Sequence, residues 1–355
     1  MKAVKTIKCV VWKATKAKIA ILEKEYKNLQ LYLQTGIDNG LYSANKQQAN
    51  RYFKKVKKGK EYPISIRNDL IKIEKKNTKI VKYWIRVPVF GRRGGLWLPV
   101  KPHCDFPDEF TVSESKILKK KDKFYIHVTI KKEIEERLCS HILAVDLGER
   151  YIAVACGDFD NQRPRFYGKE VRGIRRHYAW LRKRLGEKKL LKVIKRIGQK
   201  ERRTVDSILH AIAKDIVFTA FKTNSIIVLG DLKGIRGSAK GKGKRFKRIV
   251  SNMPYYRLSQ FIKYKASWLG IPVVIRKEYK TSTICHRCGK EGKRLSQARF
   301  TCDNCGLDYF NADVNGARNL LKRELSYMGS SGASVNMPIT EPFLVSSEAP
   351  CDSWG

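Results

Sequence analysis

Four cysteines near the end of the chain have the type and spacing of metal ligands. They form two Cys-x-x-Cys pairs, Cys285 with Cys288 and Cys302 with Cys305. Such a pair lets two thiolates converge on one cation from a tight turn, and two pairs complete a tetrahedral zinc site. The 13 residues between the pairs are enough for a short hairpin. We therefore predict bound Zn²⁺ with a structural role, because four thiolates leave the metal no open position for water.

Two carboxylates have a different kind of context. Asp146 ends the apolar stretch ILAVD, and Asp313 stands at the start of ADVNGARNLLKREL, which has helical spacing. An acid at the end of a buried strand is unfavourable unless it binds a cation or forms a turn. Metal-dependent nucleases hold Mg²⁺ or Mn²⁺ between acids from separate elements, and the metal activates water and stabilises the leaving oxygen of a phosphodiester. Asp146 and Asp313 are candidates for that chemistry.

The composition indicates the partner. The 355 residues include 75 Lys+Arg and 33 Asp+Glu, a formal charge of +42. So large an excess repels itself unless an extended polyanion neutralises it, which favours nucleic acid. The sequence has no apolar run as long as a spanning helix and no apparent secretory signal, so we expect a cytoplasmic, nucleoid-associated protein. The five cysteines outside the two pairs are expected to be reduced.

The elements that must position these residues fall into two parts. Strand patterns at 5–12 and from Pro63 to about Lys132 enclose a helical stretch over 16–62, which predicts a β-barrel-like module split by helices. Its aromatic residues alternate with Lys and Arg, so they either stack nucleic-acid bases or fill the barrel. These aromatic residues include Tyr52, Phe53, Tyr83, Trp84 and Trp97.

The second part alternates strands with helices. Two strands, ending at Asp146 and Gly157, precede a helical region over 168–224 that Gly186 and Gly198 are expected to interrupt. A buried strand then ends near Asp231. The helix PYYRLSQFIKYKASW and the strand IPVVIRKEY follow, and this order implies parallel neighbouring strands. His210, among apolar residues, is interpreted as packed in the core.

The order of these motifs resembles that of the TnpB family of transposon-encoded, RNA-guided DNA endonucleases, the relatives of type V CRISPR effectors. The resemblance is strongest in ILAVDLGERYIAVAC, HAIAKDIV, YKTSTICHRCG and CDNCGLDYFNADVNGARNL. It implies a multidomain α+β and α/β protein. The implied parts are a wedge β-barrel (1–15 and 63–137), a helical recognition insert (16–62), an RNase H-like RuvC nuclease domain (138–279 and 313–327), an inserted zinc-ribbon module (280–312) and a poorly ordered tail (328–355).

The resemblance also implies the activity and the partners. These would be a guide RNA from the transposon end and a double-stranded target DNA beside a short flanking motif, with sequence recognition delegated mostly to base pairing. Asp146 matches the family's first catalytic aspartate and Asp313 its last. We also expect the lysine-rich segment 233–248 to form a lid over the active site.

The middle catalytic glutamate of the family does not carry over, because this chain has Gly230 in its place. Glu278, at the end of the next strand, is the preferred third ligand for Mg²⁺. Asp231 is less favoured because adjacent strand residues point to opposite faces. A third reading is loss of cleavage, which would leave an RNA-guided DNA-binding protein or repressor. From a different class, a guide-independent zinc-ribbon nucleic-acid-binding protein is the remaining alternative.

Overall fold

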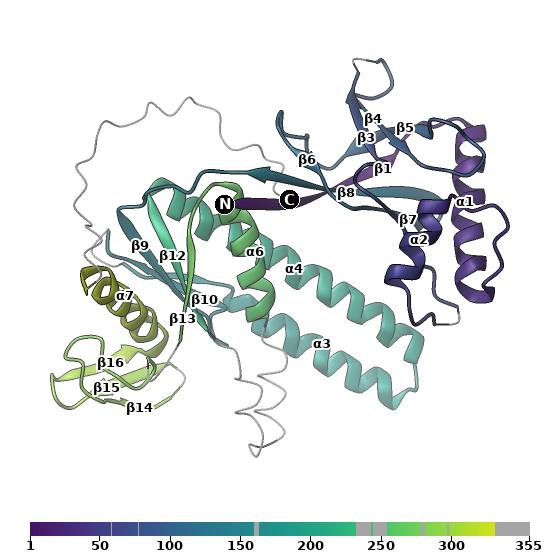
Figure 1. Cartoon of the computed structure of the whole chain (residues 1–355). Coiled ribbons are helices and arrows are strands. Elements are labelled where there is room, and N and C mark those ends of the chain that lie inside the picture. Colours follow the sequence, from purple (N-terminus) through teal and green to yellow (C-terminus); the bar gives the residue numbers. More distant parts are fainter. Residues whose placement is uncertain are drawn as a thin grey trace. The chain divides into compact units, whose positions relative to one another are not determined.

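The structure is a computed structural model that describes residues 1–57, 59–76, 78–159, 163–231, 243, 254–277, 281–296 and 298–330. The chain divides into two compact units, one of residues 2–133 and one that begins at Ile134. Figure 1 shows the elements of both units. The lysine-rich segment 233–248, apart from residue 243, and the expected tail from residue 331 onward lie outside the described residues.

The unit of residues 2–133 is built on an antiparallel sheet that curls into a half-barrel. Its strand order is β2-β7-β8-β1-β5-β4-β3, with β6 paired to β8. Alternating side chains of β1, β4 and β8 are buried, so one face of the sheet supplies the core. The strands are β1 (Lys2–Val11), β2 (Ile64–Ile66), β3 (Lys72–Lys75), β4 (Tyr83–Val87), β5 (Leu96–Pro102), β6 (Thr111–Val112), β7 (Ser115–Lys120) and β8 (Lys123–Glu133).

Two helices interrupt this sheet in the sequence, as predicted. Helix α1 (Lys16–Thr35) begins where the Thr15 side chain accepts a hydrogen bond from the Lys18 amide, and it ends at Gly36, whose φ of 78° is the usual left-handed helix stop. Helix α2 (Ser43–Tyr52) follows. Leu22, Tyr26 and Leu29 of α1 recur at helical spacing and are buried.

The second unit contains a mixed five-stranded sheet with the order β11-β10-β9-β12-β13. Strands β9, β12 and β13 are parallel, whereas β10 and β11 run antiparallel to their neighbours. The predicted parallel pairing of β12 with β13 is therefore confirmed. The strands are β9 (His141–Asp146), β10 (Ala153–Gly157), β11 (Arg165–Tyr167), β12 (Ser225–Asp231) and β13 (Val273–Lys277).

Helices cover both faces of this sheet. One face packs on α4 (Leu191–Lys222) and α6 (Tyr255–Trp268), with α3 (Lys169–Glu187) packed beside α4. The opposite face packs on α7 (Ala312–Ser330), where Leu320 and Leu321 meet Ala144 of β9 and Val228 of β12. Side chains alternate along the strands, so odd-numbered residues of β9 and β12 face α4 and α6, and even-numbered ones face α7.

A small three-stranded sheet, β14-β15-β16, precedes α7. Its strands are β14 (Lys293–Arg294), β15 (Arg299–Cys302) and β16 (Leu307–Asn311), and α7 begins at the next residue. The predicted hairpin between the cysteine pairs is thus confirmed. Phe300 is fully buried against Cys285, Cys302 and Ala312, which gives the small sheet a core of its own.

Several local expectations are decided by the structure. The helical region breaks after Gly186, as predicted, but Gly198 lies inside α4, so the second predicted break is wrong. The 32-residue α4 tolerates this glycine because its packed face continues on the C-terminal side, and one glycine inside a helix costs only about 1 kcal/mol. His210 stacks on the Phe261 ring at 3.8 Å, in agreement with a packed histidine. The short β11 was not expected.

The aromatic residues of the half-barrel differ in burial. Tyr83 is buried and packs edge-on against Phe106, so it fills the core. Trp84 and Trp97 are half-buried, and Lys18 and Lys76 lie over their rings at 4.9 and 5.3 Å. These two tryptophans retain accessible surface beside cations, as a nucleic-acid-facing position requires.

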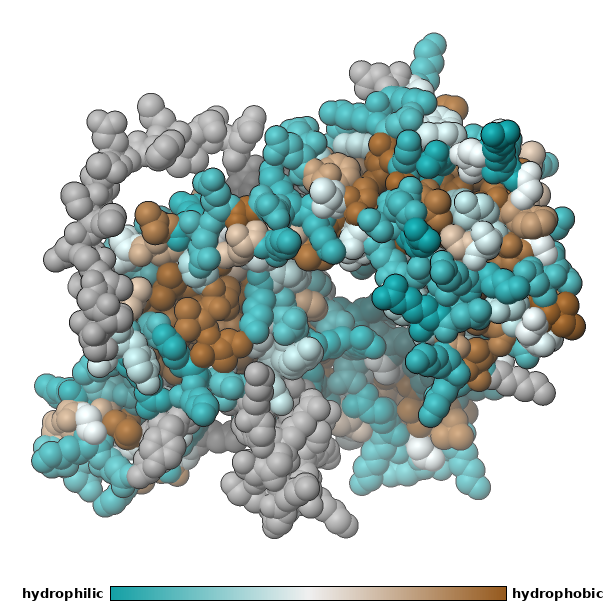
Figure 2. Space-filling view, viewed as in Figure 1, coloured by the Kyte–Doolittle hydropathy of each residue, from teal (hydrophilic) through white to brown (hydrophobic). Residues whose placement is uncertain are grey.

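Hydrophilic residues cover most of the face shown in Figure 2, and hydrophobic residues are visible where β13 lies in Figure 1. Val273, Val274 and Ile275 of this edge strand are half-buried. Within the described ranges, no helix has both the length and the hydrophobicity needed to cross a membrane.

Candidate nuclease and zinc sites

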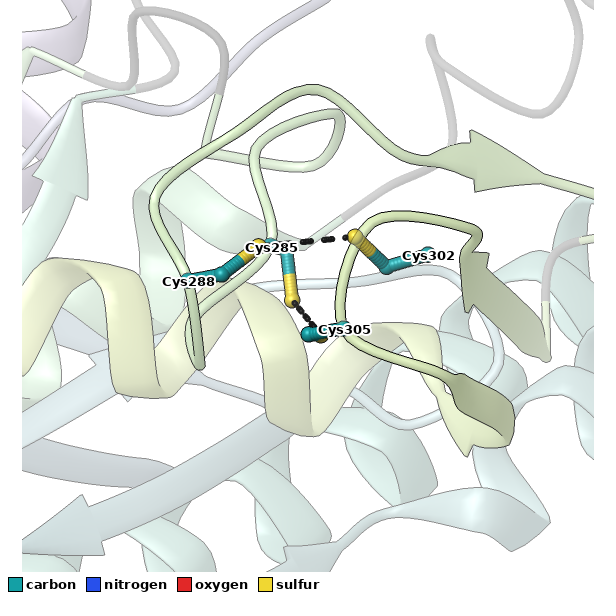
Figure 3. A group of neighbouring side chains, drawn as sticks. All are labelled: Cys285, Cys288, Cys302 and Cys305. Carbon is teal, nitrogen blue, oxygen red and sulfur yellow. Dashed lines mark hydrogen bonds between the residues drawn. The ribbon is translucent and has the colours of Figure 1, made fainter.

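The four predicted zinc ligands come together. The Sγ atoms of Cys285, Cys288, Cys302 and Cys305 all lie within 4.8 Å of one another, with 3.7 Å between Cys285 and Cys305 and 3.5 Å between Cys288 and Cys302. Figure 3 shows the side chains converging from two loops. Four convergent thiols are the donor set of structural zinc, so this cluster can bind the ion. The eight cysteines within the described residues form no disulfide.

Tight turns position these cysteines. The Gly289 amide donates to the Cys285 carbonyl at 2.9 Å, and the Cys285 amide donates to the Lys290 carbonyl at 2.8 Å. Gly289 and Gly306, which follow the two pairs, have φ of 75° and 63°, a conformation that glycine adopts without strain. A backbone hydrogen bond from Lys290 lowers the pKa of Cys288 to about 7, which favours the thiolate form that a metal requires.

Asp146 lies at the C-terminal end of β9 and faces α7. Its Oδ2 lies 3.0 Å from the position that a Cβ on Gly316 of α7 would occupy. A glycine inside a helix costs about 1 kcal/mol relative to alanine. Here the missing side chain leaves room for the Asp146 carboxylate directly against the helix backbone.

Asp313 lies in the first turn of α7. The Asn311 side chain accepts hydrogen bonds from the Asp313 and Val314 amides at 3.0 and 3.2 Å, so it caps the helix and fixes where the turn begins. Asp313 is 6% exposed, and within the described part of the chain its Oδ2 has no hydrogen-bond partner. A buried carboxylate oxygen without a donor is unfavourable, and a bound cation would satisfy it.

The two carboxylates influence each other's protonation. Burial, followed by the charge of Asp313, raises the pKa of Asp146 to about 7, and the Arg294 guanidinium opposes this shift. Burial also raises the pKa of Asp313, although Arg294 and Arg150 lower it. Two close acids with raised pKa values are typical of a functional site and are suited to a divalent cation, which would favour both charged forms.

Two charged neighbours of this pair were not predicted. Arg294 of β14 donates to Asp313 Oδ1 at 3.3 Å, so the cysteine-bearing sheet contributes a cation to the acidic pair. Glu149, in the turn after β9, adds a negative charge that raises the pKa of Asp313, and its Oε1 lies 3.1 Å from Arg172 Nε. Glu149 was detectable only as an acid three residues after Asp146.

A buried hydrogen-bond network joins the cysteine cluster to α7. Asn315 is fully buried, and its Oδ1 accepts from the His286 amide at 2.9 Å while its Nδ2 donates to the Ile284 carbonyl at 2.8 Å. Asn319 donates to the same carbonyl at 2.7 Å, and Arg318 lies 2.9 Å from His286 Nε2. The sequence signal for this network was two asparagines four residues apart on one helix face.

Strand register shows where the missing acid would have stood. Leu229 of β12 pairs with Val145 of β9, so Gly230 is beside Asp146 and shares its α7-facing side. Gly230 in turn pairs with Arg276 of β13. Asp231 falls on the opposite face, away from α7, and pairs with Lys277. Glu278 lies outside the described residues.

Comparison with known proteins gives the class first. Residues 255–320 match the model of the Cas12f1-like TNB domain. The fold is similar to that of a protein in the cryo-EM structure of the Cas12f1-sgRNA-target DNA complex. The superposition covers 86% of this chain and 80% of that protein, with a TM-score of 0.56 and 14% sequence identity. The fold is therefore that of the Cas12f group of type V effectors, with a curled half-barrel sheet and a mixed α/β sheet.

Sequence relatives narrow the class to a family. The TnpB-like protein MJ0751 of Methanocaldococcus jannaschii is 29% identical over 216 residues, 58% of this chain and 77% of that protein. The CRISPR-associated endodeoxyribonuclease Cas12f1 of Syntrophomonas palmitatica is 35% identical over 133 residues, which span 26% of its length. These relatives, the matched domain model and the shared fold together support a TnpB family protein.

Proposed function

We propose that this protein is an RNA-guided DNA endonuclease that cuts its target by divalent-metal-dependent phosphodiester hydrolysis. The observation that carries the proposal is the convergence of Asp146 and Asp313. They come from a strand end and a helix start far apart in the sequence, and Asp313 keeps a buried oxygen without a donor. The names of the relatives, a TnpB-like protein and an endodeoxyribonuclease, support the same activity.

The sheet supports assignment of the second unit to the RNase H-like, RuvC-type class. Three parallel strands carry two antiparallel strands on one side, and the candidate acid ends β9 at the centre of the sheet. Ligands in open α/β sheets bind at the carboxyl ends of the strands, as Asp146 would here. We keep the nuclease domain at 138–279 and 313–327, the wedge at 1–15 and 63–137, the recognition insert at 16–62 and the zinc module at 280–312.

Asp146, Asp313 and a third acid would hold Mg²⁺ or Mn²⁺. When bound, the metal would activate the attacking water and stabilise the leaving oxygen of the phosphodiester. The chain's own part is positional. Gly316 leaves space for Asp146, Asn311 fixes the first turn that carries Asp313, and Arg294 places a positive charge beside that acid.

We propose Glu278 as the third ligand. The alternation of β13 supports this choice, because Val274 packs on the α7 side and Arg276 forms an ion pair with Glu324 of α7. Glu278 follows β13 directly in the sequence, and a continuation of the strand would give it the same parity, next to the row that contains Gly230 and Asp146. A glutamate side chain is longer than that of an aspartate, and from β13 it can reach one strand spacing, about 5 Å, sideways toward the position of Gly230 on β12. The opposite parity of Asp231 argues against that residue.

The proposed partners are a guide RNA from the transposon end and double-stranded target DNA. The formal charge of +42 supports an extended polyanionic partner, and the Cas12f1 structure that shares the fold was determined with an sgRNA and target DNA. Zn²⁺ on the four cysteines would have a structural role. With such partners we place the protein at the nucleoid.

The test begins with the RNA that copurifies with the protein. Cleavage of DNA only when that RNA matches the target, and only with Mg²⁺ or Mn²⁺, would establish the activity. A bound RNA that directs DNA binding without cutting would instead establish a nuclease-inactive RNA-guided binder, the alternative that Gly230 favours. Nucleic-acid binding with neither RNA nor guided cleavage would indicate a guide-independent zinc-ribbon protein.

The third ligand is tested in the same assay. Glu278→Ala is expected to reduce cleavage by about 10²-fold or more, since it removes a metal-binding charge. Asp231→Ala is the matched control, with the same loss of charge on the adjacent strand, and should cleave within a few-fold of wild type. Full activity in Glu278→Ala would overturn this assignment while leaving Asp146 and Asp313 in place.

A further inference from the structure

A hollow in the unit of residues 2–133 has the chemistry of an anion site. Its volume is about 560 Å³, within the usual range of ligand pockets. The connection between β4 and β5, which reads PVFGRRGG, forms most of its wall. Arg86, Arg92 and Arg93 line it together with Tyr42, and the described lining contains no Asp or Glu.

A buried carboxylate holds the wall of this arginine pocket in place. Glu25 of α1 is 2% exposed, and its Oε2 accepts from the Phe90 amide at 2.9 Å. Its Oε1 accepts from the Tyr42 amide at 3.0 Å and from the Asn45 side chain at 2.8 Å. Asn45 also reaches the Pro88 carbonyl at 3.3 Å. The connection is therefore tied to the start of α2, and the pocket is formed before any ligand arrives.

Glycines shape the rim. Gly91, Gly94 and Gly95 have φ of 69°, 86° and 76°, the left-handed conformation that glycine adopts without strain. A Cβ on Gly95 would lie 2.8 Å from the Val87 carbonyl oxygen, so the two arms of the connection approach too closely for any side chain there. The rim consequently carries little besides backbone and arginine, which lets a bulky anion approach the guanidinium groups.

The positive charge of this pocket is not neutralised locally. Within the described ranges, no ion pair joins Arg86, Arg92 or Arg93 to a carboxylate, and Glu25 already accepts from three N–H groups. Arg92 also contributes, after burial, to lowering the pKa of Lys18. A guanidinium presents paired N–H donors that match two phosphate oxygens, so three of them around one hollow favour a phosphate ligand.

We propose that this arginine pocket binds a single phosphodiester group of the nucleic-acid partner, with the Tyr42 ring available to the adjoining nucleotide. This inference rests on the proposed function for its choice of a nucleic acid as partner. The high positive charge of the chain alone would predict only nonspecific attraction to nucleic acid. The arginine pocket would add one specific, preformed contact. A phosphate held by several guanidinium groups fixes the register of the nucleic acid without reading its sequence.

Ethylation interference tests the proposal, because an ethylated phosphate loses its charge and its ability to fit the pocket. One arm uses the copurifying RNA and the other a target duplex, both with EDTA so that no cleavage is required. The proteins compared are wild type, Arg92→Gln/Arg93→Gln and the charge-matched control Lys121→Gln/Lys123→Gln. All four substituted positions in the two variants are exposed.

In wild type and in the control, ethylation of one or two particular phosphates should weaken binding. In the arginine variant that sensitivity should disappear, with affinity about 10-fold lower and the salt slope shallower by about 1. Arg93→Lys, which keeps the charge but not the paired donors, should fall between. The arm that shows the pattern identifies RNA or DNA as the source of the phosphate.

The proposal is overturned if no phosphate loses its sensitivity selectively in the arginine variant, or if the lysine control weakens binding equally. The result does not depend on cleavage. A protein that cannot cut DNA can still show the interference pattern, and a protein that cuts efficiently without it would disprove only the arginine pocket.

Discussion

The cysteine cluster and the carboxylate pair are two candidate metal-binding regions that differ in how the chain brings their ligands together. The four cysteines lie within one short stretch of sequence, and their sulfur atoms already converge within 4.8 Å. Asp146 and Asp313 come from distant segments, and they meet because Gly316 of α7 packs against the end of β9. Four thiolates would saturate a zinc ion with protein ligands, whereas the carboxylate pair would leave a metal ion positions for water and substrate. Ligands close together in sequence suit a closed structural site, whereas ligands from separate elements suit an open, reactive site.

The two regions are physically joined. Asn315 and Asn319 of α7 hold the backbone of residues 281–286, and Arg294 of the cysteine-bearing sheet reaches Asp313. The comparison therefore predicts an asymmetry. Loss of zinc ligation should displace the two carboxylates and lower cleavage, but removal of a carboxylate should leave the cysteine cluster intact.

The largest effect is expected from Asp313→Ala. Loss of a metal ligand should reduce DNA cleavage by about 10³-fold or more, roughly 4 kcal/mol of transition-state stabilisation. RNA binding and zinc content should stay as in wild type, because the Asn311 cap and the Asn315 network do not use this carboxylate. Cleavage rates, RNA copurification and zinc analysis measure the three properties. Substantial residual cleavage would mean that the carboxylate pair is not the reactive centre.

Cys302→Ser should lower stability and cleavage together. Loss of one thiolate weakens the zinc site, and a loss of about 3 kcal/mol corresponds to a Tm lower by roughly 6–12 °C in a unit of this size. Chelation of zinc from the wild type should have the same consequence. Cys139→Ser, outside the cluster and half-buried, is the matched control and should change Tm little. Normal cleavage by a zinc-free protein would show that the two regions are independent.

The smallest effect is a pH dependence in the absence of divalent metal. The pKa of Asp146 is about 7 in the folded protein and near 4 in an unfolded chain, so the folded state binds more protons between these values. Stability should therefore fall as pH rises from about 4 to about 7, with a slope of at most about 1.4 kcal/mol per pH unit. Asp146→Asn should remove this component.

Thermal unfolding measured across this pH range, with and without Mg²⁺, tests the same carboxylate. Because the metal favours the charged carboxylates, it should raise Tm more at pH 8 than at pH 5, and it should have little effect on Asp146→Asn. Equal stabilisation of both proteins by Mg²⁺ would place its binding elsewhere.

The cysteine cluster and the hairpin between its pairs could be predicted from the sequence because all of their information is local. Turn residues, spacing and ligand type stand within a few residues of one another, and the 3.6-residue pattern similarly located α6 and α7. Asp146 and Asp313 were found from their positions at a strand end and a helix start. Their proximity depends on the packing of α7 against the end of β9, which no local pattern encodes.

Other features required the folded structure. Arg294 reaches Asp313 only because β14 is placed beside the start of α7, and no local pattern encodes that placement. The prediction of a break at Gly198 was wrong because the tertiary packing of α4 outweighs the low helix propensity of one glycine. The sequence could not distinguish a core position from a surface position for Tyr83 and Trp84. The structure places them on opposite faces of β4.

The direct passage from β16 into α7 has a consequence for protein synthesis. Asp146 leaves the ribosome long before Asp313, and Asp313 follows the last cysteine ligand by only a few residues. An incomplete chain therefore has one carboxylate and no reactive centre, however well its first sheet folds. Because zinc ligation and the start of α7 are completed almost together, a newly made chain gains its proposed capacity to cut DNA only after the last cysteine ligand and the first turn of α7 have both been made.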